Sequence, residues 1–107
     1  MSDEFQVSGL ERVPSPALLV WPDRVEANIN RMISMAGGAG RLRPHVKTHK
    51  MDAVVGLQLS AGINKFKAAT IAEVEMCLAA GAPDVLLAYP LVGPNRCLLY
   101  TSDAADE

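Results

Sequence analysis

The sequence predicts an α/β fold built on a parallel sheet. Short apolar runs alternate with segments whose apolar residues recur at helical spacing. The runs return about every 20–25 residues, which is close to the repeat of strand–helix units in parallel α/β proteins. The expected order is therefore strand, helix, strand, helix, strand, helix, strand. This pattern is compatible with both an open doubly wound sheet and a (β/α)₈ barrel.

About four strands are expected, each with an apolar run and a signal that ends it. They are residues 17–21, 42–47, 65–69 and 85–89. Pro90 ends the last of them, because proline has no N–H to donate to a strand ladder. No Gly-x-Gly-x-x-Gly motif follows the first run, so a dinucleotide-binding site has no support.

At least three helices are expected between these strands. The first opens at Pro22, with Asp23 as its cap, and Gly37 ends it by allowing a positive φ. The second helix starts at Thr48 or His49, directly after the second strand.

The third helix has the clearest start signal of the chain. Thr70 stands at the cap position and Glu73 stands at the matching capping-box position, while Gly81 stops the helix. Its apolar stripe is formed by Val74, Cys77 and Leu78.

Composition excludes several classes of protein. The net charge of −2 argues against a dedicated nucleic-acid binder. No apolar run approaches the roughly 18 residues of a membrane span. The acidic start, Ser2-Asp3-Glu4, is unlike a signal peptide, and Cys77 and Cys97 form no disulfide framework. We therefore expect a cytoplasmic protein without membrane or nucleic-acid partners.

The last residues, 97–107, differ from everything before them. They contain three acids and no base. The string resembles one reading frame of a transposon adaptor used in sequencing libraries, so we expect the native sequence to stop near Asn95 or Arg96. Residues 1–96 are then the native domain. Codons unlike the adaptor across this tail would contradict the expectation.

Residues 43–50 contain the candidate catalytic and metal-binding residues. Strand alternation places Arg43, His45 and Lys47 on one face, and Lys47 lies at the carboxyl end, where active sites of parallel α/β folds collect. A nucleophilic lysine must be neutral, and cationic neighbours favour its neutral form. Spacing alone leaves an exposed basic loop as the alternative. The pair His45 and His49 has no acid or cysteine close in sequence to complete a metal site.

Several blocks in order resemble a known family. They are residues 15–18, 43–50, 57–62, 69–73, 80–84 and 86–90. The run Pro44-His45-Val46-Lys47-Thr48-His49-Lys50 is similar to the signature of the D-threonine aldolase and D-serine dehydratase family. These are fold-type III pyridoxal 5′-phosphate (PLP) enzymes related to alanine racemase, with a (β/α)₈ barrel followed by a β-domain. The resemblance implies that residues 1–96 are the N-terminal half of such a barrel.

The resemblance also implies a site and an activity. Lys47, and not Lys50, would carry PLP, with His45 beside the cofactor. The reaction would be cleavage or dehydration of a small D-3-hydroxy amino acid by a homodimeric lyase. A divalent metal would bind only in the full-length protein, with no ligand in this chain, and the fragment would be inactive alone. The alternatives are an alanine-racemase-like racemase, a non-catalytic PLP carrier, or a phosphate- or nucleic-acid-binding module using the basic residues 27–51.

Overall fold

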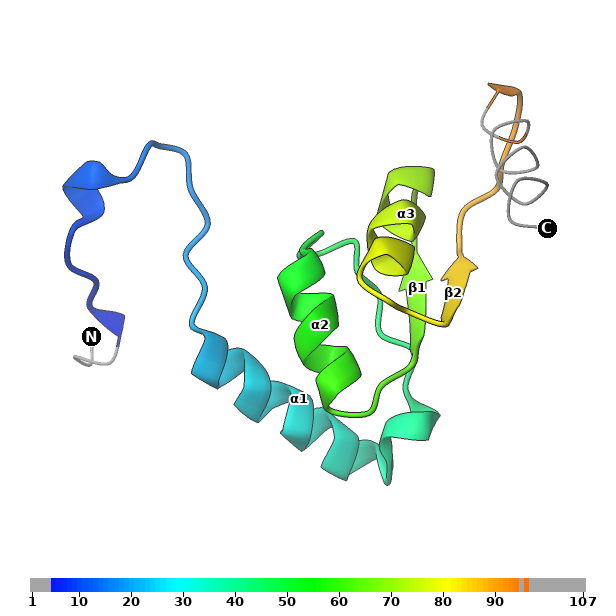
Figure 1. Ribbon diagram of the computed structural model, residues 1–107, viewed down its shortest axis with the longest axis horizontal. Helices are drawn as coiled ribbons and strands as arrows, with labels where there is room; N and C mark the ends of the chain where they lie inside the picture. Colours follow the sequence, from blue (N-terminus) through cyan, green and yellow to red (C-terminus); the bar gives the residue numbers. More distant parts are fainter. Residues whose placement is uncertain (1–4, 95, 97–107) are drawn as a thin grey trace.

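The computed structural model describes residues 5–94 and 96. Its elements are α1 (Pro22–Ala36), α2 (Asp52–Ser60), β1 (Lys65–Ala68), α3 (Ile71–Ala79) and β2 (Asp84–Leu87), with 3₁₀ turns η2 (Leu10–Arg12) and η3 (Ala39–Arg41) (Figure 1). In the described part of the chain, no helix has the length and apolar character needed to cross a bilayer. The expected tail, residues 97–107, lies outside the described residues.

The sheet is parallel, as predicted. β1 pairs with β2 in a register that places Lys65 beside Asp84 and Ala68 beside Leu87. On the other side of β1, a single parallel bridge joins His45 to Lys67. Two hydrogen bonds hold this bridge, Val46 N–H to the Lys67 carbonyl at 2.9 Å and Lys67 N–H to the Pro44 carbonyl at 2.9 Å. β1 is therefore the middle of the three segments, and the α/β prediction is confirmed.

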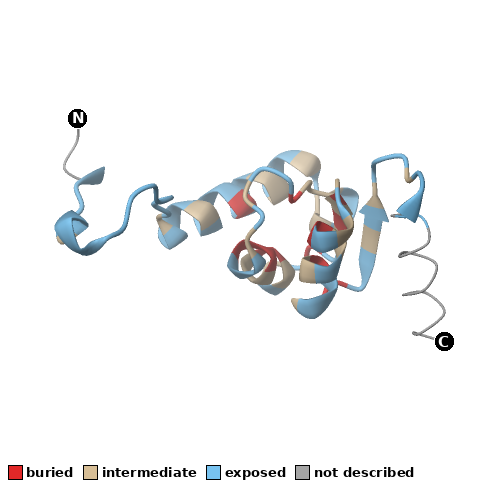
Figure 2. Cartoon of the chain, turned by 90° about the horizontal axis from the view of Figure 1, so that it is seen from above, coloured by how far each residue is buried: buried red, intermediate tan, exposed pale blue. Residues whose placement is uncertain are grey.

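One face of the sheet packs under the helices and forms the core. Val46, Phe66 and Ala68 alternate with polar neighbours and are fully buried. They meet Val55 of α2 and Cys77 of α3, which are also fully buried. Figure 2 shows the buried positions gathered between the three helices and the sheet. The polar side chains of these strands consequently lie on the opposite face.

The first two predicted strands need correction. Residues 17–21 form no strand: they have no ladder partner in the described structure, and Leu18 is 72% exposed. Residues 42–47 are reduced to the bridge at His45. A strand requires a neighbour to take its hydrogen bonds, and an apolar run without that neighbour stays an extended segment. The third and fourth strands are confirmed, each ending slightly earlier than predicted.

The first helix begins as predicted but is capped differently. Trp21 is the N-cap residue and makes no side-chain capping bond, while Pro22 occupies the first turn and Asp23 follows within it. Pro22 is well placed there, because its missing N–H would have no partner in a helix. Gly37 ends α1 with φ 85°, which confirms the predicted left-handed stop.

The second helix starts later than Thr48 or His49. Residues 47–49 form a turn, closed by a hydrogen bond of 2.8 Å from Lys50 N–H to the Val46 carbonyl. Lys50 has a φ of 51°, which a helix cannot include, so α2 starts at Asp52. In α3 the predicted cap at Thr70 is confirmed, whereas Leu78 is 51% exposed and lies outside the buried stripe.

Candidate active site

The polar face of the sheet carries the predicted site residues. The bridge places His45 beside Lys67 in one row, and alternation puts Arg43 before it and Lys47 after it on the same face. Val46, between His45 and Lys47, is fully buried on the helix side. The structure thus places His45 beside Lys67, with the charge of Lys47 acting on the His45 ring.

An ion pair fixes the amino-terminal edge of this face. The two terminal nitrogens of Arg43 donate to Asp84 Oδ1 at 2.8 Å and Oδ2 at 3.0 Å, and one of them also donates to the Phe66 carbonyl at 3.0 Å. The hydrogen bond from Arg43 holds the pKa of Asp84 below its usual value. This fork reaches over β1 and holds the bridge segment, β1 and β2 in register.

Lys47 projects from the carboxyl edge, where the polar face ends. Its residue is exposed, and its backbone N–H donates to His45 Nδ1 at 3.1 Å. The side-chain amine has no hydrogen-bond or ion-pair partner among the residues that the structure describes. Lys47 therefore presents an exposed amine without a protein partner among the described residues.

The environment of His45 beside this lysine disfavours its charged form. Loss of solvent contact, followed by the charges of Lys47 and Lys67, lowers its pKa below the ordinary 6.5. Because Nδ1 accepts the hydrogen bond from Lys47 N–H, the remaining proton is assigned to Nε2. The ring then offers one N–H donor at the polar face.

Lys50 has a different environment from Lys47, although only two residues separate them. Its Nζ donates to the Lys47 carbonyl oxygen at 2.6 Å and pairs with Glu73 Oε2 at 3.3 Å. The Glu73 side chain is only 5% exposed. Its carboxylate also accepts from Ala69 N–H at 3.2 Å and from the Thr70 hydroxyl at 3.0 Å. The Lys50 amine is thus hydrogen-bonded to a buried carboxylate and to a carbonyl.

Glu73 is ionised within this network. Burial opposes its charged form, but the hydrogen bonds from Ala69, Thr70 and Lys50 outweigh burial and lower its pKa. The sequence identified Glu73 as a capping residue and missed its contact with Lys50. Spacing along the chain contains no signal for this contact, because the two residues are 23 positions apart.

Neither histidine of the segment is arranged as a metal ligand. His45 Nδ1 accepts from Lys47, and His49 Nδ1 accepts from Met51 N–H at 2.9 Å. His49 Nε2 is enclosed without a hydrogen-bond partner in the described structure, and burial lowers the pKa of this ring. Within residues 5–94 and 96, no three histidine, cysteine or acidic side chains gather into a metal site.

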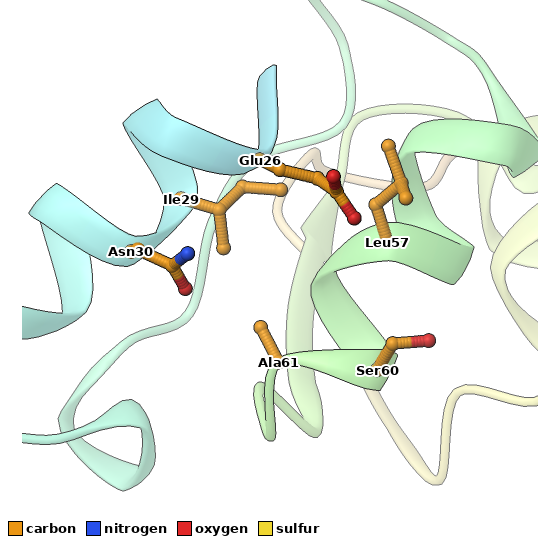
Figure 3. Close-up of a pocket in the computed structure, with 6 residues that line it drawn as sticks. All are labelled: Glu26, Ile29, Asn30, Leu57, Ser60 and Ala61. Atoms are coloured by element: carbon orange, nitrogen blue, oxygen red, sulfur yellow. The ribbon is translucent and has the colours of Figure 1, made fainter. Parts of the chain in front are cut away.

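Two hollows differ in what surrounds them. One, of about 470 Å³, lies where β1 and β2 end, and Ala69, Thr70 and Tyr89 contribute to its wall. Lys47 and His45 are not among the residues that line this hollow. The other, of about 190 Å³, lies between α1 and α2 and is lined by residues such as Glu26 and Leu57 (Figure 3). Neither of these two hollows is lined by a lysine or a histidine.

The fold and this edge define the class of the protein: an α/β domain with a free lysine amine at the carboxyl end of a parallel sheet, a position typical of enzyme active sites.

No protein-family model matches the chain. It is 40% identical over 83 residues to D-threo-3-hydroxyaspartate dehydratase of Delftia sp. (strain HT23), covering 77% of the chain and 22% of that enzyme. It is 32% identical over 91 residues to D-threonine aldolase of Arthrobacter sp., covering 84% of the chain and 24% of the relative.

A solved structure is similar as well. A variant of D-threo-3-hydroxyaspartate dehydratase matches 88% of the chain with a TM-score of 0.69 and 34% identity, over 24% of its own length. The chain is therefore homologous to part of these two enzymes, both of them lyases by name, which confirms the predicted resemblance. It spans about a quarter of the length of the relatives it matches.

Proposed function

We propose that this chain supplies the PLP-bearing lysine of a lyase that acts on small D-3-hydroxy amino acids. The observation that carries the proposal is the contrast between the two lysines of the turn. Lys47 is exposed and its amine is free among the described residues, whereas the Lys50 amine is bound to Glu73 and to a carbonyl. This contrast supports Lys47 as the residue that holds the cofactor.

The residues around Lys47 fit PLP. A covalently held pyridine ring with a phosphate needs an accessible amine, adjoining space and cationic surroundings. The face provides Lys47 and Lys67, a hollow of about 470 Å³ lies where β1 and β2 end, and the ring of His45, with its lowered pKa, offers a polar contact. His45 is thus the second residue that we assign to the cofactor site.

PLP, Lys47 and His45 have separate roles in the proposed reaction. PLP, when bound, withdraws electrons from the substrate carbon next to the amino group, so that a bond to that carbon can break. Lys47 Nζ would attach PLP at the edge of the sheet. When this amine is free and neutral, it can accept a proton. His45 keeps its proton on Nε2 and so acts as a donor rather than as a second cation. Val46, which lies between His45 and Lys47, is fully buried and packs this segment against the core.

The relatives favour a lyase over the alternatives. One is named a D-threo-3-hydroxyaspartate dehydratase and the other a D-threonine aldolase. Neither name points to a racemase or a carrier. The aldolase name corresponds to cleavage of the Cα–Cβ bond, and the dehydratase name corresponds to elimination of the hydroxyl after loss of the Cα proton. A homodimer, a divalent metal in the full-length protein and a cytoplasmic location belong to the same proposal, as does the absence of turnover from residues 1–96 alone.

Chemical trapping tests the proposal. The product of the complete reading frame is incubated with PLP, reduced with borohydride, digested and mapped by peptide mass. We expect the added mass on Lys47, its loss in Lys47→Ala, and its retention in the matched control Lys65→Ala. The loaded protein is then given a small D-3-hydroxy amino acid. Release of glycine with an aldehyde indicates an aldolase, and release of ammonia with a 2-oxo acid indicates a dehydratase. Labelling of Lys50 instead of Lys47, or racemised substrate alone, would overturn the proposal.

A further inference from the structure

The turn that carries Lys47 is shaped by Lys50. Lys50 N–H closes the turn on the Val46 carbonyl at 2.8 Å, and Lys50 has φ 51°, a conformation that residues other than glycine seldom adopt. This backbone sends its side chain back over the turn, where Nζ meets the Lys47 carbonyl oxygen at 2.6 Å. Lys50 therefore contacts the peptide unit of Lys47 directly, and leaves the Lys47 amine untouched.

The other end of Lys50 is held by a fixed point of the fold. Glu73 belongs to the first turn of α3 and its side chain is 5% exposed. Its carboxylate accepts from Ala69 N–H and from the Thr70 hydroxyl, so it cannot turn away without leaving two donors unpaired. The contact between Lys50 Nζ and Glu73 Oε2, at 3.3 Å, thus ties the Lys47 turn to the junction of β1 and α3.

We propose that Lys50 and Glu73 are positioning residues for Lys47. Glu73 anchors the Lys50 ammonium, and the ammonium fixes the Lys47 carbonyl and hence the backbone from which the reactive amine projects. This inference rests on the proposed function, because it gives the pair a purpose only if Lys47 holds the cofactor. A bound ring attached to a well-fixed lysine takes up one orientation, whereas a loosened turn lets it take up several.

The geometry also accounts for having two lysines in one short turn. An amine at position 50 that is 60% exposed would otherwise be a second target for the aldehyde group of PLP. Its two hydrogen bonds, to the Lys47 carbonyl and to Glu73, keep this amine occupied. The pair therefore also directs the cofactor to Lys47.

The test measures orientation separately from attachment. The product of the complete reading frame is loaded with PLP, and two quantities are recorded: the site of borohydride trapping and the visible circular dichroism of the bound cofactor. In Lys50→Met we expect trapping still on Lys47 but roughly ten- to a hundredfold slower, with the dichroism band lost. Lys50→Arg should restore both, because it keeps the donor. Lys65→Met, the matched control on the same face, should change neither.

The outcomes separate this inference from the proposed function. No adduct on Lys47 in the unaltered protein would refute the proposed function. An adduct on Lys47 with unchanged rate and dichroism in Lys50→Met would refute the positioning role alone. If Lys50→Met does not fold, Glu73→Gln takes its place: the inference requires a weakened dichroism band there, and a band of full strength would overturn it.

Discussion

The start of α3 offers a quantitative test of the network behind Lys47. Thr70 Oγ1 accepts from Glu73 N–H at 3.1 Å and donates to Glu73 Oε2 at 3.0 Å. Thr70→Val keeps the shape of the side chain and removes both bonds. We therefore expect the first turn of α3 to open more easily, with the carboxylate of Glu73 losing one of its donors.

The magnitude follows from burial. Loss of a threonine cap costs about 1 kcal/mol, and the exposure of Thr70 lets water reach the freed N–H, which argues against the upper end of the range. The hydroxyl bond to a buried carboxylate is charge-assisted and contributes about 1.5 kcal/mol, because water cannot readily replace the donor there. Together the change should cost about 2–3 kcal/mol in local stability.

Hydrogen exchange followed by mass spectrometry measures this cost. Amides of α3 should exchange roughly 30- to 140-fold faster in Thr70→Val, since each 1.4 kcal/mol is a factor of ten. Thr70→Ser keeps both bonds and serves as the control. Equal exchange in Thr70→Val and the unaltered protein, or equal acceleration in Thr70→Ser, would refute the reasoning.

Other changes test the core, the ion pair and the histidine. Phe66→Ala removes a fully buried ring and should lower the free energy of unfolding by about 3–5 kcal/mol, measured from the urea midpoint. Phe66→Leu should lower it clearly less. Similar losses in the two variants would argue against tight packing around this ring. Arg43→Met should lower the thermal midpoint by an amount that shrinks as salt is added, and a salt-independent loss would contradict an electrostatic role. Since the folded pKa of Asp84 is depressed, the stability from this pair is complete above the ordinary aspartate pKa and is lost as pH falls through the folded value; in Arg43→Met this acid-limb loss should be smaller. In an NMR titration His45 should have its midpoint below 6.5, and Lys67→Met should raise it, because a nearby positive charge is removed; an unmoved midpoint would show that Lys67 is not a cause.

Local signals in the sequence located several features correctly. The cap of α3 at Thr70 and the end of α1 at Gly37 each depend only on residues within one turn of that position. The structure contains both features. Alternation along 43–47 depends only on the two-residue period of extended chain, so it placed Lys47 and His45 on one face opposite Val46. These features require no knowledge of distant neighbours.

Contacts between distant segments settled the rest. Residues 17–21 have the composition of a strand, but their backbone has no ladder partner in the described structure, and residues 17–20 remain exposed. The late start of α2 at Asp52 follows from the turn that Lys50 closes, and the side chain of Lys50 is in turn held by Glu73, 23 residues away. The strand pattern and the family resemblance indicated Lys47, and a buried carboxylate brought near by folding distinguishes the occupied amine of Lys50 from the amine of Lys47, which has no partner among the described residues.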